Sequence, residues 1–117
     1  MYREIKIGDQ AVPMLAMASA GIYYKQIFGE DILKLLSTDD DDLSADRLWA
    51  TFKIGYVMAM FARYKSGAEM RKLNEGTFCT WLDHFSNVDM IAAVPDILAL
   101  YTGQQIPGVT EKNEEDG

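Results

Sequence analysis

The residues whose types could do chemistry are few, and most of them lie in one short stretch. Cys79, Asp83 and His84 could be drawn together as a metal site. Only Cys79 and Asp83 share a helix face, however, and the chain has no second histidine or cysteine to complete a ligand set. His84 follows Cys79 by five positions, which is the wrong side of a helix for a nucleophile and base pair. We therefore expect Cys79 to be a small buried hydrophobic residue and His84 to lie at the surface or in an interface.

A run of four aspartates at residues 39–42 could suggest a calcium-binding loop. Counting from Asp39 puts Leu43 at the fifth loop position, which should supply an oxygen ligand, and no glycine stands at the sixth. A solvated, self-repelling loop is the better interpretation. The sequence also lacks a glycine-rich phosphate loop. We therefore expect no catalytic residues, no bound metal and no cofactor, and we do not predict an enzyme.

The balance of charge makes nucleic acid a poor candidate partner. Eleven basic residues against eighteen acidic residues give a net charge of −7, which repels a phosphate backbone. Four basic residues, Arg63, Lys65, Arg71 and Lys72, lie close together in the sequence beside Glu69. They form either a small basic patch for an acidic protein surface or, as the favoured interpretation, an ordinary solvated loop.

Length and composition predict one folded domain. A chain of 117 residues with 49% hydrophobic and 25% charged residues has room for one core and is typical of globular proteins. The single cysteine excludes an internal disulfide and suits a reducing cytosol, and the first residues show no apolar secretory signal. We expect a single helical domain at residues 1–103, with an N-terminal β-hairpin at residues 2–17, and a disordered acidic tail at residues 104–117.

The chain is predicted to be organised around a helix at residues 43–64. Its apolar residues point in every direction at helical pitch, so this helix has to be surrounded. Lys53 interrupts the apolar part, which falls short of the ~18 residues that a membrane span needs, so protein must surround it. Because a chain this short buries only about two thirds of its unfolded surface, we expect neighbouring copies or a client to help cover the helix. Small residues at Thr51, Gly55 and Ala59 indicate that another backbone crosses there.

A hairpin and two short helices are predicted before the central helix. Alternating apolar residues on both sides of Gly8 and Asp9 predict two strands joined by a type II′ turn. Pro13 has no N–H for a strand ladder, so the second strand should lie at an edge or carry a bulge. Ser19 is expected to cap a first helix that ends at Gly29, and a second short helix follows it up to the aspartate run.

Beyond the central helix we predict a loop and two more helices. Residues 66–76 are polar and are expected to form a loop with room for one helical turn. Thr77 opens a helix whose single apolar stripe extends to Phe85. The last helix ends at Gly103 and should be kinked at Pro95, unless it begins there. The predicted fold is α+β and predominantly helical, with an N-terminal β-hairpin followed by about five helices around a central hydrophobic helix.

Large apolar side chains supply the candidate interaction residues. The seven methionines and thirteen aromatic residues suit surfaces that pack against partners, although core packing explains most of them. We expect the protein to form homo-oligomers. The residues that we expect to make core or subunit contacts, two roles that the sequence does not separate, are Trp49, Phe52, Tyr56, Met60, Trp81 and Phe85.

The order of several short motifs resembles a known family. The segment YYKQIFGED at residues 23–31 follows a short hairpin and a small-residue stretch. After it come an acidic spacer and then three further segments, YVMA at 56–59, WLD at 81–83 with Phe85, and ILAL at 97–100. In this order of elements the chain resembles, over residues 2–103, the tail assembly chaperones of long-tailed bacteriophages that infect Gram-positive bacteria.

The resemblance implies a small protein in the cytoplasm of the infected host. It would coat the long helical tape measure protein and keep it soluble while tail tube subunits assemble, without entering the mature virion. Family members are often made in two lengths by a ribosomal frameshift, and the longer form recruits tail tube protein. Here the codons for Glu111, Lys112 and Asn113 can contain the slippery heptamer A-AAA-AAC, which the gene sequence would reveal.

One alternative function belongs to a different class. A small acidic helical adaptor, for example a phage-encoded regulator of a host protein, would show the same acidic surface and the same central helix. Neighbouring genes separate the two hypotheses. A very long tape measure gene immediately downstream supports the chaperone, whereas a regulatory gene cluster supports the adaptor.

Overall fold

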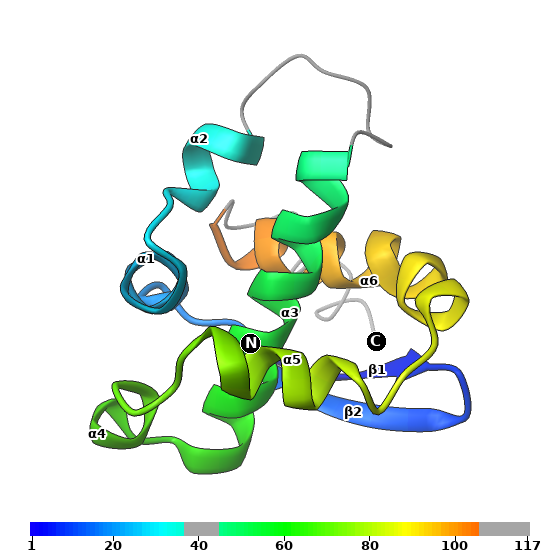
Figure 1. Ribbon diagram of the computed structural model, residues 1–117, viewed down its shortest axis with the longest axis horizontal. Helices are drawn as coiled ribbons and strands as arrows, with labels where there is room; N and C mark the ends of the chain where they lie inside the picture. Colours follow the sequence, from blue (N-terminus) through cyan, green and yellow to red (C-terminus); the bar gives the residue numbers. More distant parts are fainter. Residues whose placement is uncertain (37–44, 106–117) are drawn as a thin grey trace, which may run out of the picture.

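The structure, a computed structural model, describes residues 1–36 and 45–105 (Figure 1). The predicted α+β, predominantly helical fold is confirmed, and five helices accompany the central one. The expected acidic loop and residues 106–117 of the expected tail lie outside the described residues, whereas residues 104 and 105 belong to the last helix. The elements in chain order are β1 (Tyr2–Ile7), β2 (Gln10–Leu15), α1 (Ala20–Phe28), α2 (Ile32–Leu36), α3 (Ala45–Tyr64), α4 (Gly67–Met70), α5 (Glu75–Leu82) and α6 (Asn87–Gln105).

The central helix α3 runs through the middle of the molecule and is covered by its own chain (Figure 1). It contacts α1, α2, α6 and strand β2, with α4 and α5 near its C-terminal half. Every residue from 50 to 60 except Lys53 is buried. The expectation that neighbouring copies or a client must cover this helix is therefore wrong. Short helices and a hairpin can lie on all sides of one rod, and only Trp49 and Tyr64, near its two ends, keep large exposed apolar surfaces.

The hairpin forms as predicted and packs its apolar face inward. Gly8 has a φ of +64° between the paired residues Ile7 and Gln10, and this fits the glycine of a two-residue type II′ turn. Pro13 lies opposite Glu4. Hydrogen-bonded and non-hydrogen-bonded pairs alternate along the ladder, and the Pro13 pair is non-hydrogen-bonded, so its nitrogen points away from β1. The second strand therefore tolerates this proline because it is an edge strand.

The first two helices begin and end for separate local reasons. Gly29 adopts a φ of +75° and its N–H donates to the Lys25 carbonyl at 2.7 Å, which confirms it as the end of α1. Ser19 occupies the N-cap position, but its side chain makes no capping hydrogen bond, so the predicted capping role is wrong. At α2 the cap comes from Asp31, whose Oδ1 accepts the Leu33 N–H at 3.0 Å.

The C-terminal half differs from the predictions at helix boundaries. The one helical turn expected in the 66–76 loop is α4. Helix α5 starts two residues before Thr77, because Asn74 and Thr77 cap each other's backbone N–H groups at 3.0 and 2.9 Å. It ends at Leu82, so Phe85 lies beyond it. Helix α6 continues through Pro95 and ends two residues later than predicted, at Gln105.

Helix α6 crosses α3 at Gly55, as the strip of small residues on the central helix predicted. A Cβ atom added at Gly55 would lie 3.2 Å from Ile97 Cδ1 and 3.3 Å from Ile97 Cγ2. The Cε atom of Met14 on β2 would be 3.6 Å away. Three elements thus meet at a glycine, and the lost helix propensity of this residue is offset by their close packing.

We predict that Gly55→Val destabilises the protein by about 1–3 kcal/mol, because its two γ carbons would overpack the contact with Ile97. Urea unfolding followed by circular dichroism measures the change. Gly21→Ala is the matched control, since its Cβ would meet Ile32 Cγ2 at an ordinary 3.7 Å. A Gly55→Val protein as stable as the parent would contradict this view of the helix crossing.

Candidate protein-interaction surfaces

A chain of aromatic rings connects α1 with the end of α5. Ring centroids are 5.2 Å apart for Phe28 and Phe78, and 5.5 Å apart for Phe78 and Tyr56. The chain continues from Tyr56 to Trp81 at 5.5 Å and from Trp81 to Phe85 at 5.1 Å. Most of these pairs meet edge to face, a geometry worth roughly 0.5–1.5 kcal/mol per pair beyond simple burial. The rings hold α5 and the residues after it on α3.

Trp81 stands between two cavities, and we call this region the Trp81 surface. One cavity, of about 300 Å³, is lined by Met60, Arg63 and Trp81 together with Val12, Pro13 and Ala62. The other, of about 240 Å³, shares the first three residues and adds Tyr64, Leu73, Thr80 and His84. The floor is apolar, and the exposed rim residues Arg63, Thr80 and His84 are polar. An apolar centre with a polar rim is the usual organisation of a protein-binding site.

A hydrogen bond fixes the helix that carries Trp81. The hydroxyl groups of Tyr56 on α3 and Thr77 on α5 lie 2.6 Å apart. Thr77 also belongs to the α5 cap, so the same residue ties the start of α5 to the core. Burial raises the pKa of the Tyr56 hydroxyl above its ordinary value. The Trp81 surface is thus built on elements that are held rigidly together.

Three of the six predicted contact residues are buried, and the other three are partly or largely exposed. Phe52, Tyr56 and Met60 are buried within the chain, at 4%, 1% and 8% exposure, and belong to the core. Tyr56 and Met60 also line the Trp81 surface, together with the half-buried Trp81. Phe85 is half-buried and packs 5.1 Å from the Trp81 ring, but it lines neither cavity. The sixth residue, Trp49, is 47% exposed on the first half of α3, where its ring packs 5.5 Å from Phe52. Trp49 and Phe52 lie on α3 before Tyr56, outside the residues that line the Trp81 surface.

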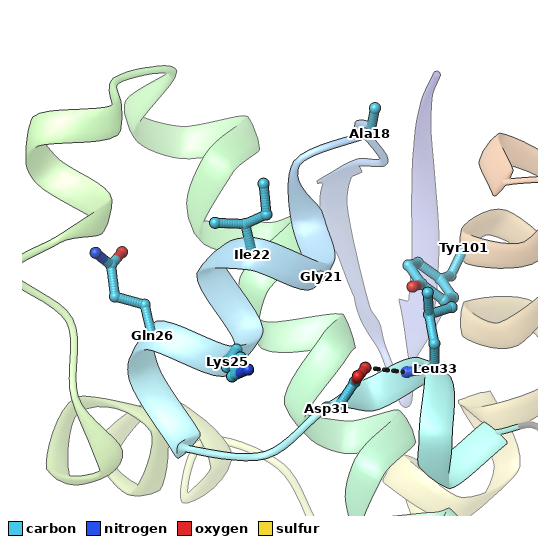
Figure 2. Close-up of a pocket in the computed structure, with 8 residues that line it drawn as sticks. All are labelled: Ala18, Gly21, Ile22, Lys25, Gln26, Asp31, Leu33 and Tyr101. Atoms are coloured by element: carbon cyan, nitrogen blue, oxygen red, sulfur yellow. Dashed lines mark hydrogen bonds between the residues drawn. The ribbon is translucent and has the colours of Figure 1, made fainter.

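A second surface was not predicted from the sequence. It is a groove of about 480 Å³ between α1, α2 and α6, which we call the α1–α2 groove (Figure 2). Ile22 and Leu33, at 68% and 57% exposure, line it, and the buried Tyr101 contributes from α6. The helical pitch was the signal that could have found it, because Ile22 lies about 200° round the helix from the buried Tyr24.

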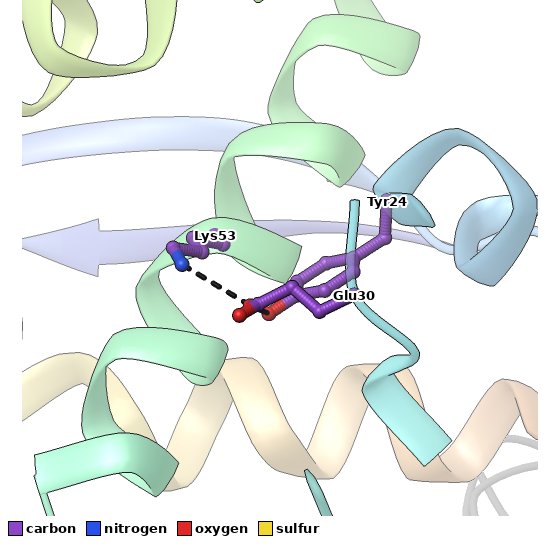
Figure 3. A network of polar contacts seen from close by, with 3 residues as sticks. All are labelled: Tyr24, Glu30 and Lys53. Atoms are coloured by element: carbon purple, nitrogen blue, oxygen red, sulfur yellow. Dashed lines mark hydrogen bonds and ion pairs between the residues drawn. The ribbon is translucent and has the colours of Figure 1, made fainter. Parts of the chain in front are cut away.

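A three-residue polar network positions the turn beside this groove (Figure 3). The buried Tyr24 hydroxyl donates to Glu30 Oε1 at 2.7 Å, and Lys53 Nζ on α3 lies 3.1 Å from the same oxygen. The Tyr24 hydrogen bond and Lys53 together lower the pKa of the Glu30 carboxyl below its usual value. Burial, with a contribution from Glu30, raises the pKa of Tyr24. One carboxylate therefore joins α1, the turn after it and α3.

The charge of the chain is unevenly distributed along the sequence. The described residues carry ten basic and ten acidic side chains, so they are balanced. The excess of seven negative charges belongs to residues 37–44 and 106–117. Two of the four clustered basic residues make local contacts, since Arg63 lies 5.6 Å from the Tyr64 ring centre and Lys72 pairs with Glu69 at 3.1 Å.

Cys79 and His84, two residues that the sequence singled out for chemistry, are both exposed. Cys79 is exposed, so the prediction that it is buried is wrong: Phe78 takes the inward position on α5, and Cys79 is turned about 100° away from it. His84 is at the surface as expected, with Nδ1 3.0 Å from the Thr80 carbonyl. Within residues 1–36 and 45–105, no three metal-binding side chains cluster. No helix in that part of the chain is long and apolar enough to cross a membrane.

Comparison with known proteins gives no match. No protein-family model, no curated protein and no solved structure matches the chain. The resemblance to tail assembly chaperones therefore rests on the order of the short motifs at residues 23–31, 56–59, 81–83 and 97–100.

We predict that Glu30→Gln lowers the thermal stability at pH 7, because the carboxylate accepts from both Tyr24 and Lys53. A folded-state pKa below the unfolded value means that this stabilisation is complete above the unfolded pKa of about 4.3 and is lost as the pH falls through the folded pKa. The difference in melting temperature between parent and variant should therefore shrink in acid.

Glu4→Gln provides the control, since Glu4 is exposed on the hairpin. Its melting temperature should follow that of the parent at each pH. A Glu30→Gln protein whose deficit persists undiminished well below pH 4 would show that the network does not act through the charge of this carboxylate.

Proposed function

We propose that this protein is a non-enzymatic assembly factor, a tail assembly chaperone that binds the tape measure protein in the host cytoplasm through the Trp81 surface. The observation that carries the proposal is a half-buried tryptophan flanked by two apolar cavities on a rigid pair of helices. Tryptophan, tyrosine and arginine dominate the binding energy of known interfaces. Trp81, Tyr64 and Arg63 bring these three types together here.

The shape of the Trp81 surface suits a helical client. Residues three or four apart on a helix present side chains roughly 5–6 Å from one another, so one client helix can place an apolar side chain on each side of Trp81. Met60 lines both cavities, and its flexible thioether adapts to different side chains. A client with many similar apolar positions, as a tape measure protein has, could be bound by many copies in succession.

The distribution of charge supports a solubilising role. The described residues of each copy are balanced in charge, and the negative excess belongs to residues 37–44 and 106–117. Copies bound along an apolar client would then surround it with like charge, which keeps such a complex dispersed. The resemblance adds two further proposals, a longer frameshifted form that recruits tail tube protein and release of the chaperone before the virion is complete.

Co-expression with the tape measure protein encoded by the same phage tests the proposal. The parent protein should bring the tape measure protein into the soluble fraction. Arg63→Glu combined with Thr80→Glu should abolish this effect, because it places two carboxylates at the rim of the apolar cavities. Both residues are exposed, so the variant should keep its fold.

Thr102→Glu is the matched control. Like Thr80, Thr102 is an exposed helical threonine whose hydroxyl donates to the carbonyl four residues earlier, but it lies on α6 away from the Trp81 surface. It should solubilise the client as the parent does. If the parent leaves the tape measure protein insoluble, the adaptor hypothesis replaces the chaperone. If the Arg63 and Thr80 variant works as well as the parent, the client binds elsewhere.

A further inference from the structure

We propose that the α1–α2 groove binds the same groove of a second copy of this chain. The resulting dimer has two-fold symmetry, and Lys25 of each copy faces Asp31 of the other. This surface is separate from the Trp81 surface, so the inference does not rest on the proposed client. It gives the expected self-association a definite location.

The α1–α2 groove is apolar at its centre. Ile22 on α1 and Leu33 on α2 are two of the most exposed large hydrophobic residues among those described, and both line this one cavity (Figure 2). Tyr101 lies in its wall and is itself buried. Isolated exposed aliphatic residues are ordinary, but a pair that lines a groove of about 480 Å³ indicates a binding surface.

The groove also carries a pair of opposite charges. Lys25 and Asp31 both line it, and neither forms an ion pair with any described residue. Asp31 is held in place because its Oδ1 accepts the Leu33 N–H at 3.0 Å, so its other oxygen remains available. A two-fold axis through the groove brings the lysine of one copy to the aspartate of the other, twice. The groove therefore complements a second copy of itself: the opposite charges pair, and the apolar side chains of the two copies face each other.

This arrangement favours a second copy over a foreign partner of strong charge. A strongly acidic partner would be attracted by Lys25 but repelled by Asp31, and a strongly basic partner would meet the opposite conflict. The described residues of each copy carry ten basic and ten acidic side chains, so they add no net repulsion between copies, and the net charge of −7 belongs to residues 37–44 and 106–117. A surface of mixed charge around an apolar centre is therefore best matched by its own symmetry mate.

The groove is also held in shape before any partner arrives. Tyr24 and Lys53 fix Glu30, the residue between α1 and Asp31, with contacts of 2.7 and 3.1 Å. Gly29 ends α1 at a defined point, and the turn into α2 follows directly. A preformed surface loses little conformational entropy on binding, so a modest apolar area is enough for reversible association.

Sedimentation equilibrium over the micromolar range tests the proposal at physiological salt. The parent protein should show a reversible monomer–dimer equilibrium. Ile22→Ser should raise the dimer dissociation constant about tenfold or more, because it removes an apolar anchor from both halves of the interface. Val88→Ser is the control, since Val88 is a 75% exposed aliphatic residue on α6 outside the groove, and its dissociation constant should equal that of the parent.

A charge exchange tests the predicted pairing directly. Lys25→Glu alone and Asp31→Lys alone should each weaken self-association about tenfold or more, because each puts like charges together at both pairs. Mixing the two variants should restore a heterodimer, in which each altered residue faces a residue of opposite charge. Recovery on mixing also shows that both variants are folded.

Three results would overturn the inference. They are a parent protein that stays monomeric throughout the concentration range, an equal loss of association in Ile22→Ser and Val88→Ser, and a mixture of the charge variants that stays monomeric. None of these results bears on the Trp81 surface. Solubilisation of the client by a monomeric Ile22→Ser protein would show that the two surfaces act independently.

Discussion

The apolar circumference of α3 is the constraint on which the structure depends. A helix that is hydrophobic on every side has to be covered along most of its length, and β2 and the five other helices each contact it. Strand β2 and helix α6 meet α3 at Gly55. Because this residue has no side chain, Ile97 packs so close that an added Cβ atom would lie 3.2 Å from its Cδ1 atom. Helices α1 and α2 cover another side, and Glu30 connects their turn to Lys53 on α3.

Because one copy of the chain covers its own core, the apolar residues that remain exposed are not needed to complete that core. Side chains that a self-sufficient core leaves at the surface are available to other molecules. Trp81 lies between two cavities at one place, and Ile22 and Leu33 line a groove at another. Both surfaces rest on elements fixed by specific hydrogen bonds, through Tyr56 in the first case and Glu30 in the second. The fold thus presents two preformed surfaces, one proposed to bind a client and the other proposed to bind a second copy.

Much of this fold could be predicted from local patterns in the sequence. The hairpin turn, the end of α1 at Gly29 and the crossing at Gly55 each depend on what a glycine permits at that position. What surrounds α3 could not be predicted, because composition gives the area to be covered but not how short helices dock. The way the short helices dock also decides that Tyr56 is buried and that Trp81 is only half-buried. The exposure of Cys79 and Ile22 was within reach, since a helical wheel places each away from a larger buried neighbour.

The central claim is that one copy of the chain encloses α3 by itself. Amide hydrogen exchange measured on a dilute, monomeric sample tests it most directly, because the slowest amides report the part of the structure that opens only on global unfolding. The account predicts that residues 50–60 exchange most slowly of all, and at a rate that does not depend on protein concentration. Rapid exchange along these residues in the monomer, with protection appearing only as copies associate, would contradict it.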